Sequence, residues 1–234
     1  MTAAELRGVG FEVNDLVAES LRRFVHLLLD ENQRQNLTGS KTADELWRVH
    51  LCDSLALVPR VREHRIARLL DLGSGGGLPG IPLACVCPDM KVTLLDATRK
   101  KIAALERMIL ALELSNTHTV WGRAEALANQ PEYREQFDGV TARAVAGLPV
   151  LIEYAAGFVC PSGHAWFYKS AAAAEAERAA AESAAQRCRL SYLATHAYRL
   201  PGEDADRALL VYRKDGVLDV QLPRRSGQAK RRPL

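Results

Sequence analysis

The chain has 234 residues, 48% of them hydrophobic, which is enough to bury one full core and an extension. No apolar run approaches the length of a membrane span and no apolar leader opens the chain, so we expect a cytoplasmic protein without a membrane segment. The net charge is +3, yet without the five basic residues of positions 222–234, 26 basic residues face 28 acidic ones. The positive charge is therefore concentrated in that last stretch.

The five cysteines indicate reduced thiols rather than disulfides or a metal centre. Their number is odd, and Cys85-x-Cys87 has no second pair at the spacing of zinc ligands. We therefore expect no metal site. The absence of a coiled-coil repeat or of an obvious swapped element favours a monomer.

Residues 1–60 are expected to form a helical N-terminal extension. Apolar side chains recur at helical spacing over residues 14–31, with Asp15 as the expected cap. A capping box, Thr42-x-x-Glu45, begins a second helix that ends at Pro59.

Three polar residues, His50, Asp53 and Ser54, lie near the inward face of this second helix. One interpretation is a buried, mutually hydrogen-bonded cluster that fixes the helix to the domain. The other is that these side chains line the edge of a substrate site.

Residues 61–220 alternate strand-like and helix-like segments, which predicts a mostly parallel, doubly wound α/β sheet. Helices are expected over residues 78–86, 98–113 and 171–187. The expected strands cover residues 66–72, 91–96, 117–121, 137–142, 163–168, 190–199 and 208–212, the last two as an antiparallel edge pair. A basic tail, residues 221–234, follows this domain.

A glycine-rich turn follows the first of these strands. Gly73-x-Gly75-x-Gly77 comes directly after an apolar run and before a helix start, as in loops that present a ligand to a helix N-terminus. The dinucleotide spacing is not met, because its third glycine would fall on Leu78. A tight turn without a ligand is the alternative, since this pattern alone is a weak signal.

The second strand ends in Asp96, where nucleotide-binding αβ units place an acid that accepts hydrogen bonds from ribose. Glycines at one strand end and a carboxylate at the next form a nucleoside pocket. Because the pyrophosphate glycine is missing, S-adenosylmethionine fits this pocket better than a dinucleotide does.

Ligands of such sheets bind outside the carboxyl ends of the strands. Those ends carry Asp71 and Gly73, then Asp96-Ala97-Thr98, Ala124-Glu125, Arg143 and Lys169. The sequence has no Asn-Pro-Pro-Tyr run, which would cradle an exocyclic amine, and no Pro-Cys order, which is expected for a cysteine nucleophile that attacks a pyrimidine ring. It also has no Ser-His-Asp pattern.

Basic residues mark two further places. The first turn of the expected helix at 98–113 carries Arg99, Lys100 and Lys101, which oppose the helix dipole. They suggest a negatively charged partner, and solvated surface charge is the alternative for each of them. The tail suggests a polyanion partner or a solvated terminus. Its five basic residues are Arg224, Arg225, Lys230, Arg231 and Arg232.

Several motifs occur together and in order along nearly the whole chain. They are Asn36-Leu-Thr38, His50-Leu-Cys-Asp-Ser-Leu55, Leu70-Asp-Leu-Gly-Ser-Gly-Gly-Gly-Leu-Pro-Gly-Ile-Pro-Leu83, Asp96-Ala-Thr-Arg-Lys-Lys101, Arg123-Ala-Glu125, Thr141-Ala-Arg-Ala-Val-Ala146, Pro223-Arg-Arg-Ser-Gly227 and Pro233-Leu234. In this combination the chain resembles the RsmG (GidB) family.

The resemblance implies a Rossmann-like class I fold and S-adenosylmethionine-dependent methylation of guanine N7 in the 530 loop of 16S ribosomal RNA, on the free RNA or on the small ribosomal subunit. It implies cofactor contacts for Gly73, Gly75, Leu78, Asp96, Ala97, Thr98, Ala124, Glu125 and Arg143. We expect Arg143 and Lys169 to act at the reaction centre by orienting the base or a phosphate, or else to serve only as structural ion pairs, Arg143 with Asp96 or Glu125. The five basic tail residues would contact RNA.

Two departures from the family pattern concern the surroundings of the site. Ser170 stands after Lys169 where glycine is usual, and Leu222 and Ala229 stand where tyrosine and proline are usual. Two alternatives remain: a class I methyltransferase acting on a small molecule or protein, and a non-catalytic nucleic-acid-binding protein. An NAD-dependent oxidoreductase is disfavoured by Leu78.

Overall fold

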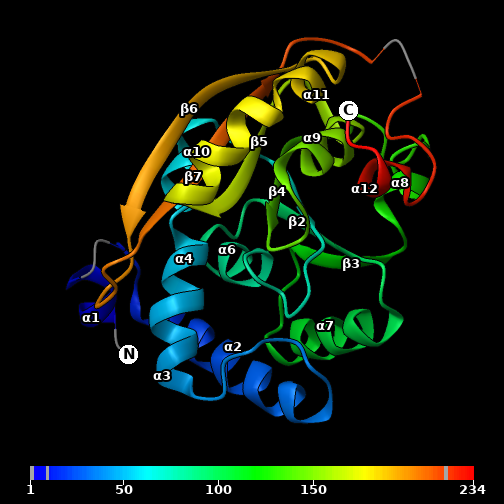
Figure 1. The fold of residues 1–234 in the computed structure, drawn as a ribbon. Coiled ribbons are helices and arrows are strands. Elements are labelled where there is room, and N and C mark those ends of the chain that lie inside the picture. Colours follow the sequence, from blue (N-terminus) through cyan, green and yellow to red (C-terminus); the bar gives the residue numbers. More distant parts are fainter. Residues whose placement is uncertain (1–2, 9–10, 219–220) are drawn as a thin grey trace.

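The computed structural model describes residues 3–8, 11–218 and 221–234, and within them seven strands form one sheet (Figure 1). In spatial order they are β3 (Thr117–Trp121), β2 (Lys91–Asp96), β1 (Arg68–Leu72), β4 (Phe137–Arg143), β5 (Val159–Ser170), β7 (Asp206–Lys214) and β6 (Leu190–Arg199). The first five are parallel, and β7 is antiparallel to both of its neighbours. The predicted mostly parallel sheet with an antiparallel edge pair is confirmed, and the strand order reverses between β1 and β4.

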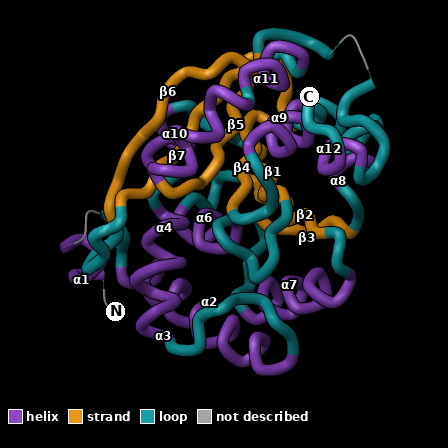
Figure 2. Tube along the Cα trace, in the orientation of Figure 1, coloured by secondary structure: helices purple, strands orange, loops and turns teal. Residues whose placement is uncertain are grey.

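Helices cover both faces of this sheet (Figure 2). On one side lie α1 (Ala3–Gly8), α2 (Asp15–Arg34), α3 (Ala43–Glu45), the π-helix η1 (Leu46–Leu51), α4 (Cys52–Leu55), α5 (Val58–Glu63), α6 (Gly80–Val86) and α7 (Arg99–Ala111). On the other lie α8 (Ala124–Leu127), α9 (Leu148–Ala156), α10 (Ala171–Ala180), α11 (Glu182–Arg187) and α12 (Gln228–Arg231).

Alternation along the strands separates two hydrophobic clusters. In β5, Trp166 and Tyr168 belong to the cluster under α2, α6 and α7, whereas Ala165 and Phe167 belong to the cluster under α9. Successive side chains of a strand point to opposite faces, so a strand buried on both faces is apolar throughout. This explains the uninterrupted apolar runs of the sequence.

The N-terminal helices differ in detail from the expectation. Asn14, not Asp15, caps α2, because its side chain accepts from the Val17 amide at 2.9 Å. Thr42 caps as predicted, but the single helix expected to run to Pro59 is divided into α3, η1, α4 and α5. The π-helical turn contains His50, and such turns often occur at functional sites.

Other differences have local causes. The alanine-rich helix expected over 171–187 is broken at Ala181, which is buried between α10 and α11. The sequence does not predict α9, because every residue from Val150 to Ala156 is buried, which leaves no amphipathic period. β5 begins four residues earlier than expected, at Val159, ahead of Pro161 and Gly163.

None of the described helices combines the length and apolar character needed to cross a membrane. Within the described residues, the chain before β1 forms helices only, and their buried residues share a cluster with Leu69 and Val92 of the sheet. The division at residue 60 stays a prediction, and the one at residue 220 lies outside the described residues.

Candidate active site

The loop after β1 requires glycine for two different reasons. Gly73, Gly75 and Gly77 all have positive φ, at 75°, 56° and 86°. A Cβ on Gly73 would lie 2.6 Å from Val145, and one on Gly77 would lie 2.6 Å from Ile81. A Cβ on Gly75 would meet nothing closer than 3.9 Å, so this residue leaves its backbone open to a ligand.

The carboxylate of Asp96 ties this loop to the end of β2. Its Oδ2 accepts from the Gly75 amide at 3.1 Å and its Oδ1 from the Thr98 amide at 2.8 Å. Each carboxylate oxygen has a further lone pair, so Asp96 can still accept from a ribose hydroxyl. Ala97 and Thr98 follow it at the surface.

Asp71, at the same edge of the sheet, is fully buried. Its Oδ2 accepts from the Gly80 amide at 2.9 Å, which fixes the start of α6, while its Oδ1 has no partner among the described residues. Burial raises the pKa of this carboxyl to about 7. The side chain of Asp71 therefore joins the end of β1 to the start of α6.

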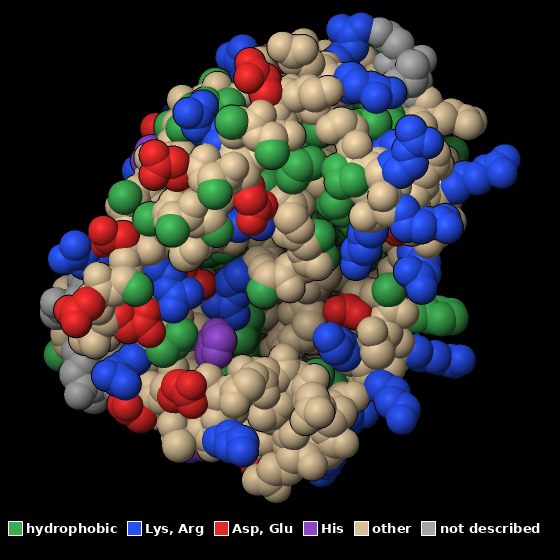
Figure 3. Space-filling view, in the orientation of Figure 1, with side chains coloured by type: hydrophobic (Ala, Val, Ile, Leu, Met, Phe, Trp, Pro, Cys, Tyr) green, Lys and Arg blue, Asp and Glu red, His purple; other side chains and the backbone are tan. Residues whose placement is uncertain are grey.

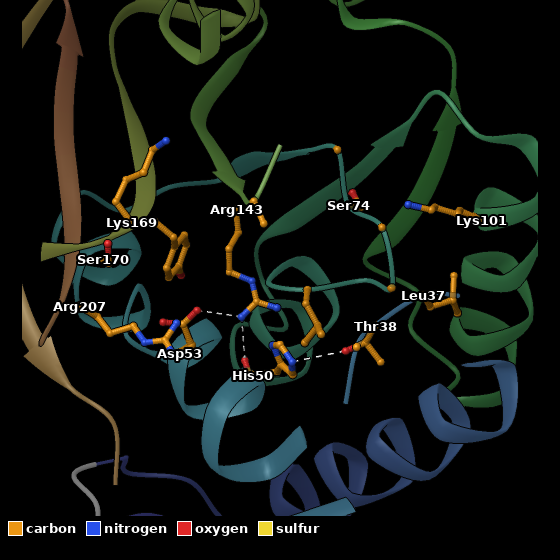
Figure 4. A pocket seen from close by; sticks show the side chains of 17 residues that line it. Leu37, Thr38, His50, Asp53, Ser74, Lys101, Arg143, Lys169, Ser170 and Arg207 are labelled. Carbon is orange, nitrogen blue, oxygen red and sulfur yellow. Dashed lines mark hydrogen bonds and ion pairs between the residues drawn. The ribbon is translucent and has the colours of Figure 1, made fainter. Parts of the chain in front are cut away.

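A cavity of about 470 Å³ opens beside the glycine loop, in the size range of small-ligand sites (Figure 4). It appears as the central hollow of the face in Figure 3. Of the predicted site residues, it is lined by Gly73, Gly75, Leu78, Arg143 and Lys169. Its other lining residues include Thr38, His50, Asp53, Lys101, Tyr168, Ser170 and Arg207. Asp96, Ala97, Thr98, Ala124 and Glu125 do not line it.

Arg143 pairs with Asp53, so the structural pairing expected with Asp96 or Glu125 is wrong. Its Nη1 lies 2.8 Å from Asp53 Oδ2 and 3.3 Å from the His50 carbonyl oxygen. The second oxygen of Asp53 accepts from the Tyr198 hydroxyl at 2.6 Å. The sequence could not show this partner, because α4, β4 and β6 meet only in the folded chain.

The polar cluster of His50, Asp53 and Ser54 has features of both interpretations, a structural anchor and a substrate-site edge. Ser54 donates to the His50 carbonyl at 2.7 Å and accepts at its own carbonyl from Tyr168, which anchors the helix to β5. His50 and Asp53 also line the cavity. Burial, aided by the charge of Arg143, lowers the pKa of His50, so its imidazole is neutral at neutral pH.

Lys169 lies at the cavity wall, where Glu177 balances its positive charge. Its Nζ is 2.8 Å from Glu177 Oε2 and donates to the Ala146 carbonyl at 3.0 Å. The next residue, Ser170, caps α10 by accepting from the Ala173 amide. The departure from glycine at position 170 therefore has a structural role.

Glu125 faces the C-terminal segment rather than the cavity. Its Oε1 accepts from the Gly227 amide at 2.9 Å and from the Tyr154 hydroxyl at 3.0 Å. Burial alone would raise the pKa of Glu125, but these hydrogen bonds outweigh burial and lower it. Ala124, just before it, is also buried.

The basic tail is docked on the second helical layer. Arg224 binds the fully buried Glu153 through its Nη2 at 2.5 Å and its backbone amide at 2.8 Å. Leu222 and Ala229, the tail residues that depart from the family pattern, are buried. The exposed basic residues of the tail are Arg225, Lys230, Arg231 and Arg232.

The residues present fit S-adenosylmethionine. Gly75 offers an open backbone cradle, Asp96 offers a carboxylate at the adjacent strand end, and the cavity continues from Leu78 to the polar wall at Arg143. A nucleoside with a cationic side chain needs these features.

Comparison with known proteins identifies the family of the chain. The profile of the GidB family, rRNA small subunit methyltransferase G, matches residues 17–202. The chain is 35% identical over 225 residues to the ribosomal RNA small subunit methyltransferase G of Carboxydothermus hydrogenoformans, covering 96% of this chain and 95% of that protein. It is 37% identical over 229 residues to the protein of that name from Gloeobacter violaceus, covering 97% and 90%.

Solved structures share the fold at low identity. A protein from Klebsiella pneumoniae, provisionally named an O-methyltransferase, superposes with a TM-score of 0.60 at 14% identity over 92% of this chain and 97% of that one. A predicted O-methyltransferase from Agrobacterium tumefaciens gives 0.53 at 22% identity over 63% and 74%. The fold is thus the Rossmann-like class I methyltransferase fold, and S-adenosylmethionine is the methyl donor. The chain belongs to the rRNA small subunit methyltransferase G (GidB) family and is an rRNA methyltransferase.

Proposed function

We propose that the protein transfers a methyl group to N7 of a guanine in the 530 loop of 16S ribosomal RNA. The observation that carries this proposal is a cavity with two unlike sides, the glycine loop on one and Arg143, Lys169 and Arg207 on the other. The first side suits a nucleoside cofactor, and the second suits the acceptor-rich edge of a guanine or a phosphate.

The cofactor would be held by the predicted set of residues. Gly73, Gly75 and Leu78 lie at the loop, and Asp96 would bind the ribose. Ala97, Thr98 and Arg143 complete the proposed set. Ala124 and Glu125 belong to it by the family resemblance alone, because Ala124 is buried and Glu125 faces the C-terminal segment. When bound, S-adenosylmethionine supplies an electrophilic methyl group on a sulfonium sulfur.

Guanine N7 needs no general base, because it carries a free lone pair and no proton. Because N7 would attack through this lone pair, no proton would have to leave the base, and no residue of the cavity would have to accept one. Holding the reacting atoms about 3–3.5 Å apart and in line supplies much of the acceleration. The side chains of the cavity therefore orient the base.

The charges of the wall suit a reaction that moves positive charge onto the base. Asp53 offsets Arg143 at 2.8 Å, Glu177 offsets Lys169 at 2.8 Å, and His50 is neutral. A guanidinium has five N–H donors, so Arg143 keeps some for the O6 and N7 edge of guanine. If Lys169→Ala abolished turnover with unchanged affinity for RNA and cofactor, its role would be chemical.

The exposed tail residues Arg225, Lys230, Arg231 and Arg232 would contact RNA phosphates, whereas Arg224 is committed to Glu153. In Figure 3, Lys and Arg side chains gather along the right-hand edge of the face, around α12 and α8. A cytoplasmic monomer that meets 16S RNA or the small ribosomal subunit is part of this proposal.

Reverse-transcription mapping of N7-methylguanine in 16S RNA tests the proposal. Cells lacking the gene should lose one modification in the 530 loop, the wild-type gene should restore it, and Asp96→Asn should not. Arg143→Lys keeps the charge but loses the planar donor set, so it should restore the modification poorly. An unchanged modification pattern in cells without the gene would favour a small molecule or protein as the substrate.

A further inference from the structure

Trp121, the last residue of β3, is an exposed tryptophan at the edge of the sheet. Its relative exposure is 56%, whereas the other two tryptophans, Trp47 and Trp166, are 6% and 0% exposed. β3 is an edge strand, and Arg99, the first residue of α7, lies beside this indole. Trp121 therefore presents aromatic ring surface to solvent.

The indole is fixed in place by two contacts. Its Nε1 donates to the Ala97 carbonyl at 3.2 Å, so its one polar group is satisfied within the protein. The guanidinium carbon of Arg99 lies 5.5 Å from the ring centroid, a cation–π distance. What Trp121 offers to a partner is therefore ring surface, next to a planar cation.

The surroundings are cationic and adjoin the cavity. Lys100, next to Arg99 in the chain, and Arg123, two residues after Trp121, are exposed, and Lys101 lines the cavity. Figures 1 and 2 both place β3 beside α7, and Figure 3 shows Lys and Arg gathered along this edge with hydrophobic surface between them. A negatively charged partner that enters the cavity passes close to this surface.

We propose that Trp121 and Arg99 form a stacking platform for an unpaired RNA base outside the methylation cavity. Aromatic rings and guanidinium planes are the surfaces on which proteins stack splayed single-stranded bases, while nearby cations bind the phosphates. This inference rests on RNA being the substrate, and it adds a second nucleotide-binding position to the proposed function. The platform reads an unpaired base and rejects a duplex, whose bases are stacked already.

Intrinsic fluorescence gives a direct test, because Trp121 is the exposed tryptophan of the chain. Titration with a short single-stranded RNA should quench the emission, and the same strand annealed to its complement should quench it much less. A chain that binds the single strand without any change in emission would contradict the platform.

Affinity measurements with matched variants give the second test. Stacking is worth roughly 1–3 kcal/mol per base, so Trp121→Ala should weaken binding of the single strand by about 5- to 150-fold, and Trp121→Phe should keep most of the affinity. Arg99→Ala has a control in Arg178→Ala, because Arg178 lies 5.3 Å from the ring centroid of Tyr192, away from the cavity. Both variants lose one charge, so a larger loss for Arg99 reports on stacking. Equal losses, or wild-type binding by a folded Trp121→Ala protein, would overturn the inference.

Methylation assays on the same proteins separate this inference from the proposed function. If wild type and Trp121→Ala methylate 16S RNA with the same KM, the platform is wrong and the proposed function stands. If the single strand quenches Trp121 but no RNA is methylated, the platform stands and the proposed function is wrong.

Discussion

Replacing Asp53 by asparagine removes the charge that Arg143 pairs with, at 2.8 Å. The side chains of Asp53 and Arg143 are only 3% and 13% exposed, so the guanidinium would keep its charge with little water to replace the carboxylate. Removing one partner of a buried pair costs about 3–5 kcal/mol. The asparagine can turn its amide oxygen to Arg143 and donate its NH2 to the Tyr198 hydroxyl, and Arg143 reaches the cavity, so we expect the lower end, about 3 kcal/mol.

Thermal melting measures this loss. For a chain of this size, 1 kcal/mol corresponds to about 2–4 °C, so Asp53→Asn should lower the Tm by about 6–12 °C and also reduce kcat/KM. Asp206→Asn is the matched control, since Asp206 pairs with Arg199 at the surface, and its Tm should equal that of wild type.

A double variant, Asp53→Asn with Arg143→Gln, should lose less unfolding free energy than the sum of the losses of the two single variants, because no unpaired charge remains. If Asp53→Asn had the same Tm as the Asp206→Asn control, the pair of Asp53 and Arg143 would not stabilise the fold and the reasoning would be refuted.

Three further outcomes are expected. Because burial raises the pKa of Asp71 to about 7, the folded state binds a proton that the unfolded state releases near pH 4, so stability should fall between about pH 4 and 7; urea melts of wild type and Asp71→Asn should show different slopes there, and equal slopes would contradict this. Gly75→Ala should cost about 1–2 kcal/mol of unfolding free energy, since its φ is 56°, whereas Gly216→Ala, outside that region and in open space, should be neutral; equal denaturation midpoints would refute the strain argument. Arg224→Gln should lower the Tm by leaving a buried carboxylate unpaired, whereas Arg225→Gln should keep the Tm and weaken RNA binding; the reverse result would reassign the two residues.

The features that the sequence predicts are those set by local rules. Parallel strands end at one edge of a sheet, so the placement of Gly73, Asp96 and Arg143 at that edge follows from recognising the strands. The stripe on α2 is predicted because helical spacing survives wherever one face is solvated. The same rule fails for α9, whose residues from Val150 onward are all buried.

The features that the sequence does not predict depend on contacts between distant segments. Asp53 and Arg143 are 90 residues apart, and Glu125 and Gly227 are 102 apart. The sequence marks these residues as candidates, but the partner of each is fixed only when helices and strands pack. Trp121 escaped notice for a similar reason, since an apolar residue closing a strand is expected in the core and only the edge position of β3 exposes it.

The docked position of residues 222–234 affects the entropy change when the protein binds a polyanion. Glu125 and Glu153 hold this segment through Gly227 and Arg224, so its backbone loses its freedom during folding rather than at the encounter. A disordered basic arm would incur that entropy on binding, with the heat-capacity change of coupled folding. Here the cations are already presented at fixed spacing, so association resembles the docking of two preformed surfaces.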